Sequence, residues 1–212
     1  MESLTMKPEE IETESFRIID CEAGDHGWAE PEWQIVRRAI HTSADFEYAQ
    51  AMVFSDDVVD EAIAALTSGA GIVTDTNMAL SGISKPRLVA FGCSVSCHVA
   101  DPDVAELAKR EGITRSIAAM RKAVANPDNR IFVIGNAPTA LFELLRLVEN
   151  GSAKPALIIG LPVGFVGAEE SKNALAAGGH EIPFVTNIGR KGGSNVAAAV
   201  VNALAILAAE RQ

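Results

Sequence analysis

The sequence predicts a single α/β domain in which helices cover both faces of a mainly parallel sheet, preceded by a helical N-terminal segment. Apolar residues make up 48% of the 212 residues and aromatic residues only 5%, a mixture that suits helices packed on buried parallel strands. After about residue 68, short apolar runs alternate with helical periodicity, which is typical of strand–helix–strand units. We therefore expect one three-layer α/β/α domain over residues 1–212, with residues 1–7 as a disordered tail.

The chain up to about residue 68 is predicted to be helical, because its apolar residues are spaced three and four apart. Pro31 opens one of these helices. Three of its residues share an apolar face: Trp33, Val36 and Ile40. The segment Ser55-Asp56-Asp57 is typical of a helix N-terminus, and the helix that it predicts ends before Gly69.

Five later apolar runs are predicted to be the strands, over residues 71–75, 88–99, 131–134, 156–160 and 182–185. The helical stretches that follow them cover residues 101–110, 114–125, 137–150, 167–177 and 193–209. In such a sheet, ligands bind at the carboxyl ends of the strands, where the strand-to-helix turns gather. We therefore look for functional residues in those turns.

Charge and cysteine content limit the possible partners. The net charge of −10 means that the surface on average repels nucleic acid and anionic membranes. The apolar runs are shorter than the roughly 18 residues of a membrane-spanning helix. Three cysteines without disulfide-framework spacing favour reduced thiols. We expect a cytoplasmic protein that binds neither nucleic acid nor membranes, and that meets any anionic ligand with local clusters of basic residues.

A metal site is not expected. Cys93 and Cys97 are predicted to lie on one face of the strand over residues 88–99, while His98 points to the other face. Three such side chains do not converge on one ion, so buried core thiols are the better interpretation.

Three segments carry residues suited to an anion. The turn from Gly160 to Gly167 leads into a helix whose first amides can bind a carboxylate, although a turn that binds nothing explains the same glycines. In the next such turn, Arg190 and Lys191 lie between glycines, which favours an anion cradle over a solvated loop. Arg115 lies in the first turn of a helix, an unfavourable place for a cation unless it faces an anion.

His41 has the most suggestive neighbours of the histidines. On a helix it lies three and four residues after Arg38 and Arg37, so both arginines flank it. A histidine can transfer a proton near neutral pH. A histidine that only contacts the last carbonyl groups of its helix is the alternative, and a lone histidine by itself favours that alternative.

Several segments resemble, in family order, those of the precorrin-8X methylmutases. They are residues 40–48, 74–79, 112–115, 135–142, 160–172 and 189–194, and the whole match spans from about residue 8 to about residue 205. The resemblance implies an α/β homodimer that holds a corrinoid near the subunit interface. It also implies a [1,5]-shift of a methyl group from C-11 to C-12 of the ring, which gives hydrogenobyrinate or cobyrinate without a protein cofactor.

The resemblance implies roles for individual residues as well. His41 corresponds to the family's catalytic histidine, which protonates the ring system and so promotes the migration. Ser15, Arg115 and the turn glycines correspond to substrate contacts, and a net-acidic protein needs basic residues there to bind the substrate's carboxylates. The expected substrate-binding residues are Ser15, Arg37, Arg38, Ser84, Arg115, Asn136, Gly164, Gly167, Lys172, Arg190, Gly192, Gly193 and Ser194.

The family has two branches, which act on the cobalt-free or the cobalt-containing ring, and residues 41–45 and 74–78 look more like the cobalt branch. The cobalt then belongs to the substrate. Two other classes stay open at this point. A non-catalytic corrinoid or anionic-metabolite binding protein needs the basic turns but no titrating histidine. A nucleotide-dependent enzyme is disfavoured because neither a dinucleotide fingerprint nor a P-loop is present.

Overall fold

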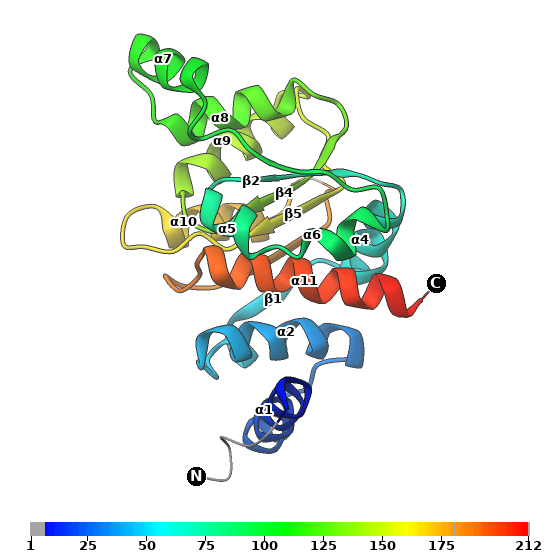
Figure 1. Ribbon diagram of the computed structural model, residues 1–212. Helices are drawn as coiled ribbons and strands as arrows, with labels where there is room; N and C mark the ends of the chain where they lie inside the picture. Colours follow the sequence, from blue (N-terminus) through cyan, green and yellow to red (C-terminus); the bar gives the residue numbers. More distant parts are fainter. Residues whose placement is uncertain (1–6, 180, 212) are drawn as a thin grey trace.

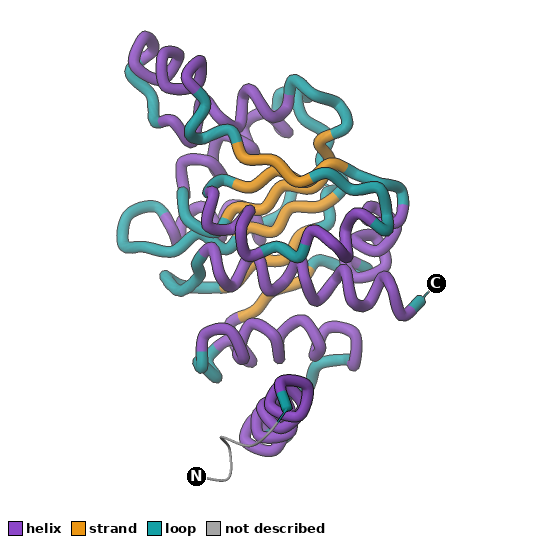
Figure 2. Tube along the Cα trace, viewed as in Figure 1, coloured by secondary structure: helices purple, strands orange, loops and turns teal. Residues whose placement is uncertain are grey.

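The computed structural model describes residues 7–179 and 181–211 and contains a six-stranded sheet with helices on both faces (Figures 1 and 2). Its strands are β1 (Met52–Phe54), β2 (Gly71–Thr74), β3 (Val95–Cys97), β4 (Asn129–Ile134), β5 (Leu157–Gly160) and β6 (Phe184–Asn187). The order is β1-β6-β5-β4-β2-β3, and only the β1–β6 pair is antiparallel among the described strands. The predicted three-layer fold with a mainly parallel sheet is confirmed.

The prediction of five strands missed β1, which lies in the stretch assigned to helices. This strand has three residues and pairs with the edge of β6, from Met52 with Asn187 to Phe54 with Val185. A strand this short shows no alternating pattern, so its pairing with distant residues is what makes it extended.

The predicted strand over residues 88–99 is also wrong in part. Lys85–Val89 form helix α6, and only Val95–Cys97 form β3. Leu88 and Cys93 are buried at 1% and 7% exposure, so the apolar run reflects burial rather than extended backbone. Cys93 therefore does not share a strand with Cys97, and its thiol instead donates to the carbonyl of Leu66 at 3.2 Å.

One face of the sheet is covered by α11 (Ser194–Glu210), with α4 (Val58–Thr67), α5 (Asn77–Gly82) and α6 beside it (Figure 1). Helix α2 (Glu30–Ser43) packs on α11 through a buried stripe that includes Ile35, Val36, Ala39 and Ile40. Helix α1 (Pro8–Ala23) packs on α2, and the short α3 (Tyr48–Ala51) leads from α2 toward β1. The predicted N-terminal helical segment is thus present.

The other face is covered by α8 (Arg115–Val124), α9 (Pro138–Glu149) and α10 (Ala168–Ala176), while α7 (Pro102–Glu111) packs on α8 away from the sheet (Figure 1). Among the described residues, the helices are all too short or too polar to cross a bilayer. Of the tail predicted over residues 1–7, residues 1–6 lie outside the described residues. Lys7 is described, and its N–H donates to Glu10 Oε2 at 2.8 Å, so it caps α1.

The parallel strands place four turns at one edge of the sheet, at the left in Figures 1 and 2. They follow β2, β4, β5 and β6 and lead into α5, α9, α10 and α11. Because β1 runs antiparallel, its beginning lies at this edge rather than its end. The C-terminal end of α2, which carries His41, therefore lies at the same edge as the turns.

Candidate active site

The turns over residues 161–167 and 188–193 form one connected unit. The N–H of Gly193 donates to the carbonyl of Leu161 at 3.0 Å, and the N–H of Gly164 donates to that of Arg190 at 3.2 Å. Gly192 leaves no room for a side chain, because a Cβ there would clash with the carbonyl oxygens of Leu161 and Pro162. Glycine at this position is what lets the two turns meet.

Lys172 lies beneath this unit rather than on its surface. Its side chain belongs to α10 and is only 1% exposed, and Nζ donates to the carbonyl of Lys191 and to Asn187 Oδ1. Burial lowers the pKa of Lys172 to about 8. Lys172 was expected to bind the substrate directly. Its side chain is instead buried and contacts the inner side of the turn over residues 188–193.

The β4–α9 turn packs against the beginning of α11. A Cβ on Gly135 would lie 2.7 Å from Ser194 Cα, so this position also requires glycine. Ser194 Oγ lies 2.8 Å from Thr76 Oγ1, which in turn accepts the N–H of Ala79 at 3.1 Å. This hydroxyl pair joins the first turns of α5 and α11. Thr76 was not among the predicted site residues, although it lies in the turn after β2 and in the family-like segment 74–79.

Asp75 organises the same edge from within the core. It is 1% exposed, and its carboxylate accepts the N–H groups of Gly135, Asn136 and Ala137 at 3.0, 2.9 and 2.7 Å. Burial raises the pKa of Asp75, and these three donors oppose that shift. Because Asp75 occupies the amides in front of α9, a substrate carboxylate does not bind them; the exposed side chain of Asn136 remains accessible.

His41 lies exposed in the last turn of α2, with its ring against Phe16 of α1. The two ring centroids are 5.1 Å apart. The guanidinium groups of Arg37 and Arg38 lie over the same Phe16 ring, 4.6 and 5.0 Å from its centroid. Phe16 therefore orients His41 and both flanking arginines, a role that the sequence alone did not indicate.

Both flanking arginines are paired with acidic residues of α1. Arg37 lies 2.9 Å from Asp20, and Arg38 lies 3.1 Å from Glu12. Their charges are therefore already compensated before any ligand binds. The neighbouring Ser15, on the same helix, donates its hydroxyl to the carbonyl of Ile11 at 2.8 Å.

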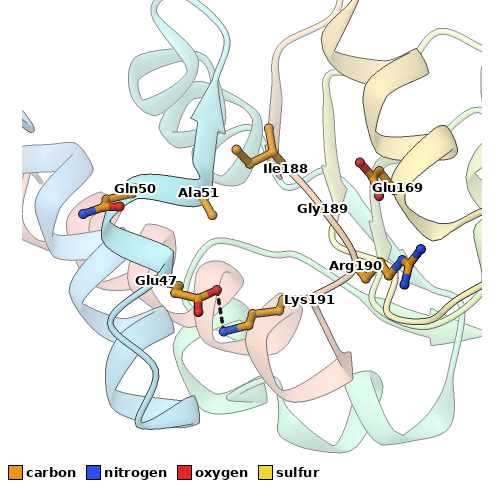
Figure 3. A pocket seen from close by; sticks show the side chains of 8 residues that line it. All are labelled: Glu47, Gln50, Ala51, Glu169, Ile188, Gly189, Arg190 and Lys191. Carbon is orange, nitrogen blue, oxygen red and sulfur yellow. Dashed lines mark ion pairs between the residues drawn. The ribbon is translucent and has the colours of Figure 1, made fainter.

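The segment after His41 is bonded to the turn over residues 188–193, which is called the cationic turn because it carries Arg190 and Lys191. Lys191 Nζ lies 2.5 Å from Asp45 and 2.7 Å from Glu47, the second pair being drawn in Figure 3. Asn195 Nδ2 also donates to the carbonyl of Thr42 at 3.4 Å. These contacts bring the end of α2 and the beginning of α11 to one place.

A pocket of about 550 Å³ opens beside this turn (Figure 3). Arg190 and Lys191 point to opposite sides of it: Lys191 points toward Glu47, and Arg190 points away from these two residues, on the side where Glu169 lies. Arg190 also lies over the ring of Phe165, 5.7 Å from its centroid, and that ring is 83% exposed. The lining residues are Glu47, Gln50, Ala51, Glu169, Ile188, Gly189, Arg190 and Lys191.

Arg115 lies exposed at the first turn of α8, whose cap Thr114 bonds Thr139 at the beginning of α9 at 3.2 Å. Within the described part of the chain, neither Arg115 nor Arg190 has an ion-pair partner, unlike Arg37 and Arg38.

Two other expected site residues lie elsewhere. Gly167 precedes α10 with a φ of 78°. Ser84 is placed differently from the other expected site residues, because its N–H donates to Asn202 in the middle of α11.

Comparison with known proteins agrees with this arrangement. A model of the precorrin-8X methylmutase family matches residues 10–207. A cobalt-precorrin-8 methylmutase of Priestia megaterium is 49% identical over 97% of this chain and 90% of that protein. One of Salmonella typhimurium is 47% identical over 93% of this chain and 94% of that protein. A precorrin-8X methylmutase of Sinorhizobium is 44% identical over 90% of this chain and 90% of that protein.

The solved structure of a precorrin-8X methylmutase from Thermus thermophilus superimposes with a TM-score of 0.86 at 41% identity. The match covers 95% of this chain and 98% of that one. Sequence and fold thus agree over almost the whole length, and the chain belongs to the precorrin-8X methylmutase family.

Proposed function

We propose that the protein is an isomerase of cobalamin biosynthesis that moves a methyl group from C-11 to C-12 of the precorrin-8 ring. The observation that carries the proposal is that an exposed histidine, His41, lies in the last turn of α2, whose next residue, Thr42, is bonded to the beginning of α11. Two exposed arginines outside the ion pairs of the described residues, Arg115 and Arg190, lie in or next to the strand-to-helix turns. The matched relatives are methylmutases, which favours an enzyme over a non-catalytic binding protein.

In the proposed mechanism, His41 donates a proton to the ring system, which makes the macrocycle electron-poor and promotes migration of the methyl group. The ring gives a proton back to the neutral imidazole after the shift, so that no net proton is consumed. The bond from the methyl carbon to C-11 breaks as the bond to C-12 forms, so no electron donor or acceptor is consumed. Phe16 holds the imidazole in position. No cofactor of the protein takes part.

The substrate is an apolar ring that carries several carboxylates. We propose that Arg115 and Arg190 bind these carboxylates, because the other arginines near His41 are paired with Glu12 and Asp20. Phe165 and Val166, exposed at 83% and 89%, provide apolar surface beside Arg190. The cytoplasm is the compartment that we propose for the reaction.

We favour the cobalt-containing ring as substrate. Relatives at 49% and 47% identity bear the cobalt name, while one at 44% bears the cobalt-free name. The test is to incubate the purified protein separately with precorrin-8 and with cobalt-precorrin-8 and to follow the absorption spectrum. We expect faster conversion of the cobalt form. An unchanged spectrum with both rings would refute the proposed activity.

We further propose a homodimer with the site near its interface. The observation behind this proposal is that apolar side chains such as Phe165, Val166 and Met78 are left exposed around the site, as expected of a surface that a second copy covers. We expect sedimentation at micromolar concentration to give the mass of two chains. A fully active monomer would contradict this assignment.

A further inference from the structure

Lys172 is a buried lysine that makes no ion pair with an acidic side chain in the described part of the chain. Lysine is almost never fully buried unless its charge is paired, because removing an ammonium from water is costly. Here the side chain is 1% exposed, and the acidic group that favours its charged form is Glu169, on the same helix. Asp45 and Glu47, which also lie near the turn, are paired with Lys191 instead.

The contacts of Lys172 fix the backbone of the cationic turn. Its Nζ donates to the carbonyl of Lys191, which also accepts Asn187 Nδ2 at 2.9 Å. Asn187 is fully buried, accepts Lys172 Nζ at 3.3 Å and donates to the carbonyl of Ile188 at 2.9 Å. Both ends of the segment that carries Arg190 are thus held by one lysine–asparagine pair.

We propose that Lys172 is a positioning residue: its buried ammonium holds the 188–193 turn in its ligand-binding shape, and a ligand carboxylate bound at Arg190 offsets its charge. This inference rests on the proposed function only for the identity of the ligand. Lys172 does not touch the substrate, since the turn lies between them. It acts through the position of Arg190 and Gly192 and through the positive potential that it adds below them.

The Lys172→Met variant separates this role from simple packing. Methionine has a similar length without the charge, so the cost of burying the ammonium disappears while buried Asn187 Oδ1 loses its donor. These two effects oppose each other, and we expect the thermal midpoint to change little. The loosened turn should nevertheless raise KM by about tenfold or more, with kcat changed by less than about twofold. A residue that only filled space would leave KM unchanged, because the methionine side chain fills nearly the same volume.

The pH dependence gives a second measurement. In the free protein the pKa of Lys172 is about 8, against 10.5 for an unburied lysine. The unfolded chain therefore binds more protons between these two values, and the free energy of unfolding should rise with pH in this window. A bound carboxylate favours the ammonium, so cobyrinate should bind up to about tenfold more weakly at pH 9 than at pH 7, with proton uptake above pH 8.

The experiment compares wild type, Lys172→Met and the control Lys154→Met, which removes an exposed lysine near the opposite edge of the sheet. Binding of cobyrinate is measured by titration calorimetry, and exchange of the amide hydrogens of residues 188–193 is measured without ligand. We expect faster exchange and weaker binding only in Lys172→Met. Unchanged exchange in that variant would overturn the inference whatever the ligand. Failure of the wild type to bind cobyrinate would instead count against the proposed function.

Discussion

Replacing His41 with alanine should reduce the rate of methyl migration by about a hundredfold or more, the usual contribution of a positioned proton donor. The fold should survive, because His41 is exposed at the end of α2 and its helix is held by the buried residues facing α11. Binding of the product should survive too, because Arg115 and Arg190 remain. The measurement is the absorption change under single-turnover conditions, with product affinity measured in parallel.

His26→Ala is the matched control for this variant. His26 lies in the loop between α1 and α2. Its ring stacks on that of Trp33, with the centroids 3.7 Å apart. It should leave turnover nearly unchanged. Near-normal turnover of His41→Ala would show that His41 is not the proton donor and would favour a protein that binds the corrinoid without converting it.

Asp75→Asn is expected to cause a large loss of stability. Asparagine replaces one of the two carboxylate oxygens with an NH₂ group, which then faces backbone N–H groups of the turn before α9. Leaving such buried groups unsatisfied should lower the free energy of unfolding by about 3–5 kcal/mol. Denaturant unfolding at neutral pH measures this value.

The control for Asp75 is Asp103→Asn, an exposed aspartate at the beginning of α7 whose side chain pairs with Lys122. Its unfolding midpoint should stay close to that of the wild type. If Asp75→Asn unfolds at the same denaturant concentration as the control, Asp75 does not hold the β4–α9 turn, and the substrate's carboxylates have access to the amides of that turn.

Local patterns were sufficient for the fold class and for the prediction that the strand-to-helix turns lie at one edge of the sheet. Apolar runs between helical segments indicate buried parallel strands, and such strands necessarily bring their following turns to one edge. The turns with Gly135, Gly164 and Gly192 were therefore found from sequence. His41 was found as well, but only the family resemblance, not the residue itself, favoured it as catalytic.

What the sequence by itself determined was thus a three-layer α/β domain, together with the prediction that its glycine-rich turns, basic residues and one histidine bind an anionic ligand. Only the tertiary structure decided which of those basic residues are exposed and unpaired, and so able to bind a ligand carboxylate. Arg37 and Arg38 are paired with Asp20 and Glu12 of another helix, and Lys172 lies beneath the turn that it was expected to share with the ligand. Burial and ion pairing join residues far apart in the chain, so periodicity and spacing, which report only neighbours along it, do not reveal them.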